Sequence, residues 1–114
     1  MPEKIQVLFA SSEVSPLAQT GGLAEVAGSL PQAIASHGLD ATVIMPAYRQ
    51  TLKQFQFKEL YPGLSVTMDG KERPCSVLGG RGRGNQRVLL IRRDKYFDRE
   101  GLYGDGAAAY PDNP

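Results

Sequence analysis

The sequence predicts an α/β domain built on a parallel sheet, and two apolar runs carry that prediction. Residues 5–10 form a short, nearly continuous apolar run, as expected of a parallel strand covered on both faces. After a loop and a helical pattern, residues 41–45 form a second β-rich run, which ends at Pro46. The first half of the chain therefore has a β–α–β pattern, and such a crossover is almost always right-handed within a parallel sheet, which favours an α/β fold.

The segment between the two strands has the pattern of an amphipathic helix. Thr20 is the expected N-cap, and Gly38 follows the expected last turn at His37. Pro31 lies inside the pattern and should kink the helix or split it in two. Apolar side chains recur at intervals of three and four residues and form one apolar face: Leu23, Val26, Ala27, Leu30 and Ile34.

The second half of the chain predicts shorter elements. A short helix over residues 50–57 is followed by strands with a turn at Asp69-Gly70 between the first two. The last strand is the most apolar and should rejoin the central sheet. The three expected strands are 64–68, 74–78 and 87–91.

The segment 79–84 is rich in glycine and arginine but lacks the context of a dinucleotide-binding fingerprint. It lies between two expected strands, and no helix follows it. We expect an exposed hairpin loop with weak anion affinity through Arg81 and Arg83.

Composition and charge exclude several classes of protein. The 114 residues include 13 Lys and Arg against 12 Asp and Glu, so nothing favours binding to nucleic acid or to an acidic membrane. One cysteine cannot form an internal disulfide, and no metal-type cysteine spacing exists. The first apolar run is too short for a membrane span and lacks a signal-type cleavage region. We expect a cytoplasmic protein with no metal, cofactor, nucleic-acid or membrane partner.

The loop Thr20-Gly21-Gly22 is the main candidate site. Ligands of α/β sheets bind at the carboxyl ends of the strands, where this loop follows the first strand. Adjacent glycines let a phosphate or sugar approach the backbone, and amides at a helix N-terminus favour an anion. The alternative is a tight turn whose glycines require positive φ angles. Glu13 and Glu25 flank the loop and could contact a sugar hydroxyl or a basic partner, although a first-turn carboxylate such as Glu25 is commonly solvated.

Several motifs, in order along the chain, closely resemble the N-terminus of bacterial glycogen synthases and plant starch synthases. Residues 50–87 match weakly, and the segment Tyr110-Pro111-Asp112-Asn113 is similar to a family motif that is cut off before it finishes, so we expect a truncated chain. The motifs that carry the resemblance are Ser12-Glu13-Val14-Ser15-Pro16, Gln19-Thr20-Gly21-Gly22-Leu23-Ala24-Glu25-Val26, Gly28-Ser29-Leu30-Pro31, Met45-Pro46-Ala47-Tyr48-Arg49 and Tyr96-Phe97-Asp98-Arg99-Glu100-Gly101-Leu102-Tyr103-Gly104.

The resemblance implies a retaining GT-B glycosyltransferase with two Rossmann-like domains facing a cleft. Such enzymes transfer glucose from ADP-glucose to the non-reducing end of an α-1,4-glucan. Residues 1–114 would form part of the N-terminal, acceptor-side domain, without the C-terminal domain and most catalytic groups. The chain alone should therefore be inactive. Two other functions stay open: a GT-B glucosyltransferase with a different nucleotide-sugar donor, and a glucan- or nucleotide-binding module without catalysis.

The resemblance also implies the roles of particular residues. Preorganised amides of the glycine loop would face the donor diphosphate without a metal. Two residues depart from the family pattern: Gln19 stands where the family has lysine, and Glu25 where it has aspartate. An amide brings no positive charge, so donor binding should weaken unless another cation compensates. The donor-binding candidates are Gln19, Thr20, Gly21, Gly22 and Glu25, and the possible acceptor-side residues are Tyr96, Phe97 and Asp98.

The run Tyr96-Phe97-Asp98-Arg99, with Tyr103 and Tyr110, also has an interpretation from its residue types alone. Aromatic faces stack on sugars, so it could form a carbohydrate-contacting surface. The alternative is a loop that is pinned down by its own aromatic side chains.

Overall fold

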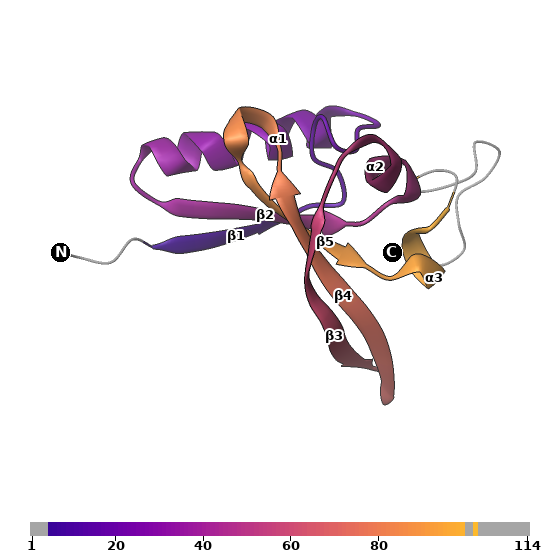
Figure 1. Ribbon diagram of the computed structural model, residues 1–114. Coiled ribbons are helices and arrows are strands. Elements are labelled where there is room, and N and C mark those ends of the chain that lie inside the picture. The colour runs from indigo at the N-terminus through magenta and orange to yellow at the C-terminus, as the bar shows by residue number, and fades with distance from the viewer. Residues whose placement is uncertain (1–4, 100–101, 103–114) are drawn as a thin grey trace.

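Five strands form one mixed sheet in the order β1-β2-β5-β4-β3 (Figure 1). The computed structural model describes residues 5–99 and residue 102. β1, β2 and β5 are parallel, while β4 is antiparallel to both β5 and β3. In chain order the elements are β1 (Gln6–Ala10), α1 (Gly22–Ser36), β2 (Asp40–Pro46), α2 (Arg49–Gln54), β3 (Lys58–Met68), β4 (Lys71–Arg81), the 3₁₀ turn η1 (Arg83–Asn85), β5 (Arg87–Arg92) and α3 (Asp94–Phe97).

The predicted β–α–β unit is confirmed. β1 and β2 pair in parallel from Gln6 beside Asp40 to Ala10 beside Ile44, and α1 connects them. β5 rejoins this parallel part of the sheet, with Val43 beside Val88. The mixed sheet with its helices is therefore an α/β fold whose antiparallel part is the β3–β4 hairpin, which projects away from α1 in Figure 1.

Residues 5–99 and residue 102 do not cover β1 on both faces, which corrects the sequence prediction for the described residues. It is an edge strand, and the side chain of Leu8 is 61% exposed. The buried side chains of the neighbouring β2 alternate along the strand and include Val43 and Met45. Because these packed side chains point to one face only, the described elements bury that single face of the parallel strands.

The face of α1 that packs inward is made of small residues and includes only Ala27 of the predicted apolar stripe. Leu23, Val26 and Leu30 are 48%, 53% and 41% exposed, so their expected burial is wrong for the described chain. The physical reason is a close approach of the preceding loop: a Cβ on Gly28 would lie 2.8 Å from the carbonyl oxygen of Ser15. The buried residues of α1 are Ala24, Ala27, Gly28 and Pro31.

The ends of α1 confirm one prediction and correct another. Gly38 follows the helix with a φ of 85°, and its N–H donates to the carbonyl of Ala35, as expected of a glycine after a C-cap. The N-cap, however, is Gly21, because the hydroxyl of the predicted cap, Thr20, donates instead to Glu13. α1 also runs unbroken through Pro31, so it is not split there.

The glycine- and arginine-rich segment belongs largely to a strand. Gly79 and Gly80 lie inside β4, which corrects the prediction that the whole segment 79–84 is a loop. A Cβ on either glycine would lie within 2.6 Å of a side chain of the preceding segment, Leu60 or Phe57, so those side chains occupy the space. The predicted turn at Asp69-Gly70 is confirmed, since both residues have positive φ.

The core lies between α1, the loop after β1 and one face of the sheet. Val43, Met45, Val88 and Leu90 of the central strands are almost completely buried there. Leu17 of the loop joins the same cluster, so the loop is packed into the core. No helix in the described part of the chain is long and apolar enough to cross a membrane.

We predict that Gly28→Ala lowers the free energy of unfolding by about 1–3 kcal/mol, because its Cβ would force Ser15 away from α1. Gly63→Ala is the matched control, since a Cβ there meets nothing within 4 Å. The control should leave stability unchanged or raise it by up to about 1 kcal/mol. Chemical denaturation of the two variants measures the difference, and equal stabilities would contradict the packing described.

Candidate functional site

The loop between β1 and α1 is fixed by hydrogen bonds to its own backbone and to the start of α2. Val14 and Ala18 form an antiparallel bridge with N–O distances of 3.1 and 2.9 Å. The buried hydroxyl of Thr51 donates to the carbonyl of Leu17 at 2.9 Å. Three buried apolar residues and a buried hydroxyl therefore hold the loop in one conformation before any ligand arrives.

A buried carboxylate sets the position of the glycine loop. Glu13 is only 4% exposed, and its Oε1 accepts hydrogen bonds from the backbone N–H of Thr20 and from its hydroxyl, the latter at 2.6 Å. The sequence suggested that Glu13 could contact a sugar hydroxyl, but in the structure Oε1 of Glu13 is already hydrogen-bonded to Thr20. Glu13 thus acts here as the anchor for the residue that precedes the two glycines.

The backbone does not require glycine at residues 21 and 22. Gly21 has a φ of −169°, which any residue can adopt, and Gly22 is the first residue of α1. Neither is among the glycines with positive φ, which contradicts the tight-turn alternative. A Cβ added to either one meets no atom of the described residues within 4 Å. These two positions therefore leave open space beside amides at the N-terminus of a 15-residue helix.

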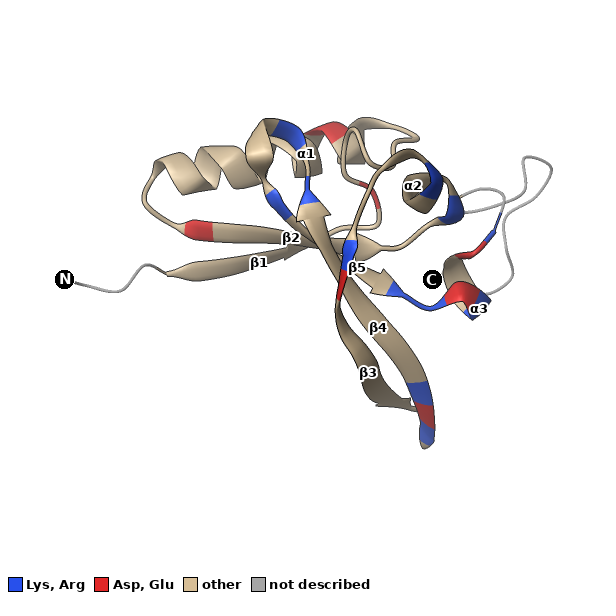
Figure 2. Ribbon diagram, viewed as in Figure 1, with Lys and Arg blue, Asp and Glu red and all other residues tan. Residues whose placement is uncertain are grey.

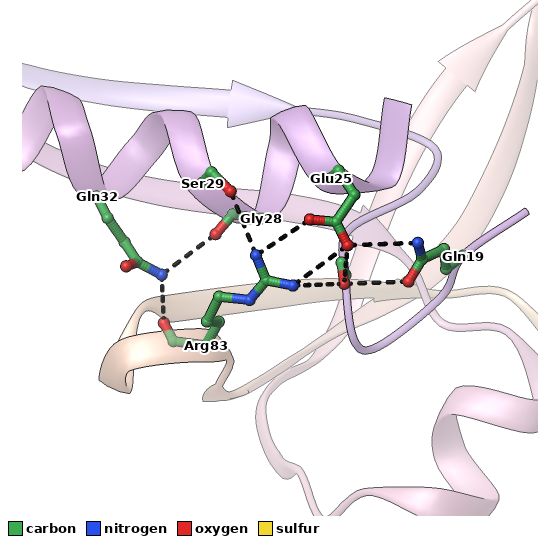
Figure 3. Close-up of polar contacts among 7 residues, drawn as sticks. Gln19, Glu25, Gly28, Ser29, Gln32 and Arg83 are labelled. Carbon is green, nitrogen blue, oxygen red and sulfur yellow. Dashed lines mark hydrogen bonds and ion pairs between the residues drawn. The ribbon is translucent and has the colours of Figure 1, made fainter. Parts of the chain in front are cut away.

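A polar cluster lies beside this open backbone, and Figure 3 shows its contacts. The hydroxyl of Ser15 donates to Oε1 of Gln19 at 3.1 Å and to Oε1 of Glu25 at 3.2 Å. The amide nitrogen of Gln19 donates to the same Glu25 oxygen at 3.4 Å. Two of the predicted donor-site residues, Gln19 and Glu25, are therefore brought together by one serine.

Arg83 completes the cluster from a distant part of the chain. Its Nη2 donates to Oγ of Ser15 at 2.8 Å, and its Nη1 donates to Oγ of Ser29 at 3.2 Å. The two nitrogens also contact both carboxylate oxygens of Glu25, at 3.3 and 3.4 Å. In Figure 2 the basic segment of the turn between β4 and β5 accordingly lies beside α1.

The sequence predicted weak anion affinity for Arg83 but not its contact with the glycine loop. The two residues of the Arg83–Glu25 pair are 58 positions apart, and no local pattern places the β4–β5 turn against α1. The side chains of both are about half exposed, so the ion pair by itself adds little stability. The hydrogen bond and the charge of Arg83, helped by Ser15, hold the pKa of Glu25 below its ordinary value.

The possible acceptor-side residues lie after β5 and make contacts within the chain. The ring of Phe97 packs edge-on against Tyr48 at a centroid distance of 5.8 Å. The guanidinium of Arg93 lies 4.5 Å from the ring centre of Tyr96. Asp98 accepts a hydrogen bond from Nε of Arg49 at 2.9 Å. These contacts agree with the interpretation of a segment held by its own aromatics, whereas Tyr103 and Tyr110 lie outside the described residues.

Tyr48 connects this segment to the loop after β1. Its hydroxyl donates to the carbonyl of Ser12 at 2.9 Å, while its ring contacts Phe97. Residues that follow the parallel strands β1, β2 and β5 therefore meet at the carboxyl edge of the sheet, where ligands of such sheets bind. Within the described residues, no group of three His, Cys, Asp or Glu side chains is placed to hold a metal ion.

The comparisons with known proteins agree with one another. The family described as starch synthase catalytic domain matches residues 6–114. The chain is 43% identical over 108 residues to the glycogen synthase of Moorella thermoacetica and 40% identical over 109 residues to that of Syntrophotalea carbinolica. These matches cover 93% and 96% of this chain but 21% and 22% of the relatives, so the chain spans about a fifth of their length.

A solved structure gives the same result. The catalytic domain of starch synthase IV from Arabidopsis thaliana, bound to ADP and acarbose, superposes with a TM-score of 0.75 at 25% sequence identity. The match covers 90% of this chain and 22% of that one. The mixed sheet with its helices is therefore the fold found in this catalytic domain.

We predict that Arg83→Ala raises the pKa of Glu25 toward its ordinary value, because the variant removes the main hydrogen bond and charge that lower it. A carboxylate with a lowered pKa stabilises the fold above its unfolded-state pKa, and this contribution is lost as the pH falls through the folded-state pKa. NMR titration of the Glu25 carboxyl measures the change. Arg87→Ala is the control, since Arg87 pairs with Asp40 instead. An unchanged Glu25 titration in Arg83→Ala would contradict the pairing.

Proposed function

Because the chain belongs to the starch synthase catalytic domain family, we propose that it forms the front of the N-terminal domain of a glycogen synthase. The whole protein would transfer glucose from ADP-glucose to the non-reducing end of an α-1,4-glucan, in the cytoplasm, with retention of configuration. The donor-binding domain and most catalytic groups would belong to the rest of that protein. Residues 1–114 would supply part of the acceptor-side domain and the loop that reaches the sugar diphosphate.

The observation that carries the proposal is the open backbone at Gly21 and Gly22. Neither the backbone nor packing among the described residues needs glycine there, and the absence of side chains leaves room for a group that approaches from outside. The N-terminal amides of α1 favour an anion. The donor diphosphate is such an anion, and the starch synthase IV structure was solved with ADP bound.

The proposed chemistry places charge where these amides can stabilise it. The bond between the glucosyl carbon and the diphosphate oxygen breaks, and its electron pair stays on the departing ADP. The acceptor hydroxyl forms the new glycosidic bond to the same carbon and passes its proton to the departing diphosphate. Preorganised donors that face the leaving diphosphate lower the barrier because the negative charge there increases in the transition state.

The remaining candidates take supporting roles in this proposal. Thr20 positions the glycines through its bonds to Glu13, while Gln19 offers an amide to the donor. Glu25 lies three residues after Gly22, one helical turn from the open amides. Tyr96, Phe97 and Asp98 lie at the same edge of the sheet, and we place them on the acceptor side, where their packing shapes the surface.

A donor-competition assay on the full-length protein that carries this chain tests the proposal. ADP-glucose should elongate a maltooligosaccharide primer, and excess unlabelled UDP-glucose should compete poorly. A preference for UDP-glucose would show a different nucleotide-sugar donor. Binding of ADP or glucan without elongation would show a non-catalytic module. The matched control is residues 1–114 alone, which should not elongate the primer.

A further inference from the structure

The polar cluster beside the glycine loop contains one cation whose position relates it to Gln19. Arg83 and Gln19 share two partners, the hydroxyl of Ser15 and Oε1 of Glu25. Their polar ends are therefore separated by a single intervening group. Among the described residues, Arg83 is the one cationic side chain that is hydrogen-bonded to Ser15 or Glu25.

The turn that carries Arg83 is held in place by its backbone. The carbonyl of Arg83 accepts hydrogen bonds from Nε2 of Gln32 at 2.7 Å and from the N–H of Gln86 at 3.1 Å. Gly84 has a φ of 61°, and a Cβ there would lie 3.0 Å from the side chain of Gln32. Because these contacts hold the turn against α1, the backbone of Arg83 has a fixed position from which its side chain extends.

The guanidinium keeps capacity for a further ligand. Its two Nη atoms contact Ser15, Ser29 and Glu25, whereas its Nε–H has no hydrogen-bond partner within the described residues. The side chain is 40% exposed, so solvent and solutes reach it. A planar guanidinium binds phosphate oxygens through paired N–H donors, and a diphosphate can replace a carboxylate that is half exposed.

We propose that Arg83 supplies the positive charge that faces the donor diphosphate, in place of the lysine that the family resemblance implies at the position of Gln19. Glu25 and Ser15 hold the guanidinium at the edge of the glycine loop until the donor arrives. In this chain the positive charge at the donor site would therefore lie on the β4–β5 turn and not on the glycine loop. This inference rests on the proposed function, because the anion it binds is the diphosphate of that reaction.

Replacing Arg83 in the full-length protein tests the proposal. Arg83→Gln should raise the Michaelis constant for ADP-glucose and the dissociation constant for ADP by about tenfold, since it removes a charge-assisted hydrogen bond to phosphate. Arg83→Lys keeps the charge and should stay closer to the wild type. Arg87→Gln is the matched control, because it removes the same charge at the start of β5, where Arg87 pairs with Asp40, and ADP affinity should not change.

A charge-relocation variant separates donor binding from a structural role of Arg83. Adding Gln19→Lys to Arg83→Gln should recover most of the lost ADP affinity, whereas a lysine in the glycine loop cannot restore the contact between the turn and α1. Arg83→Gln with unchanged ADP affinity, equal losses in Arg83→Lys and Arg83→Gln, or no recovery in the double variant would each overturn the proposal.

Calorimetric titration with ADP keeps this test independent of the proposed reaction. If the wild-type protein transfers no glucose, the proposed function fails while the ADP titrations still decide the role of Arg83. If transfer from ADP-glucose occurs but Arg83→Gln binds ADP as the wild type does, only the present inference fails.

Discussion

The close packing of Ser15 against Gly28 determines where the polar groups of the site meet. With no Cβ on Gly28, the loop after β1 lies directly on α1, and a side chain there would collide with the Ser15 carbonyl at 2.8 Å. This contact brings the Ser15 hydroxyl to Glu25, Gln19 and Arg83 at the same time. The lack of a Cβ at Gly28 therefore lets the loop after β1 meet both α1 and the β4–β5 turn near the start of α1.

The same constraint explains the exposed surface of α1. A helix that approaches its neighbour this closely presents alanine, glycine and proline inward, so its larger apolar residues remain outside. Leu23 and Val26 are about half exposed for that reason. The uncovered face of β1, with Leu8, adds to the apolar surface that the described residues leave accessible.

Local chemistry in the sequence predicted the elements better than it predicted their contacts. Apolar runs identified β1, β2 and β5. Gly38 marked the end of a helix and Asp69-Gly70 marked a turn, and these residues have the positive φ angles that their types favour. Periodicity could not tell which face of α1 packs inward, because small residues and large apolar ones follow similar spacings. The Arg83–Glu25 pair joins positions 58 residues apart, so no local signal reveals it. Motif resemblance indicated the glycine loop, but only the geometry excluded a turn that needs positive φ.

The central claim is that Gly21 and Gly22 lack side chains for the sake of an external anion. Gly22→Ala in the full-length protein tests it most directly, with unfolding and the Michaelis constant for ADP-glucose measured on the same preparation. The stability of Gly22→Ala should equal that of the wild type or exceed it by up to about 1 kcal/mol, since alanine favours the helix. The Michaelis constant for the donor should rise about tenfold or more, because a methyl group would occupy the approach to the amides. An intact protein with an unchanged donor Michaelis constant would contradict the account.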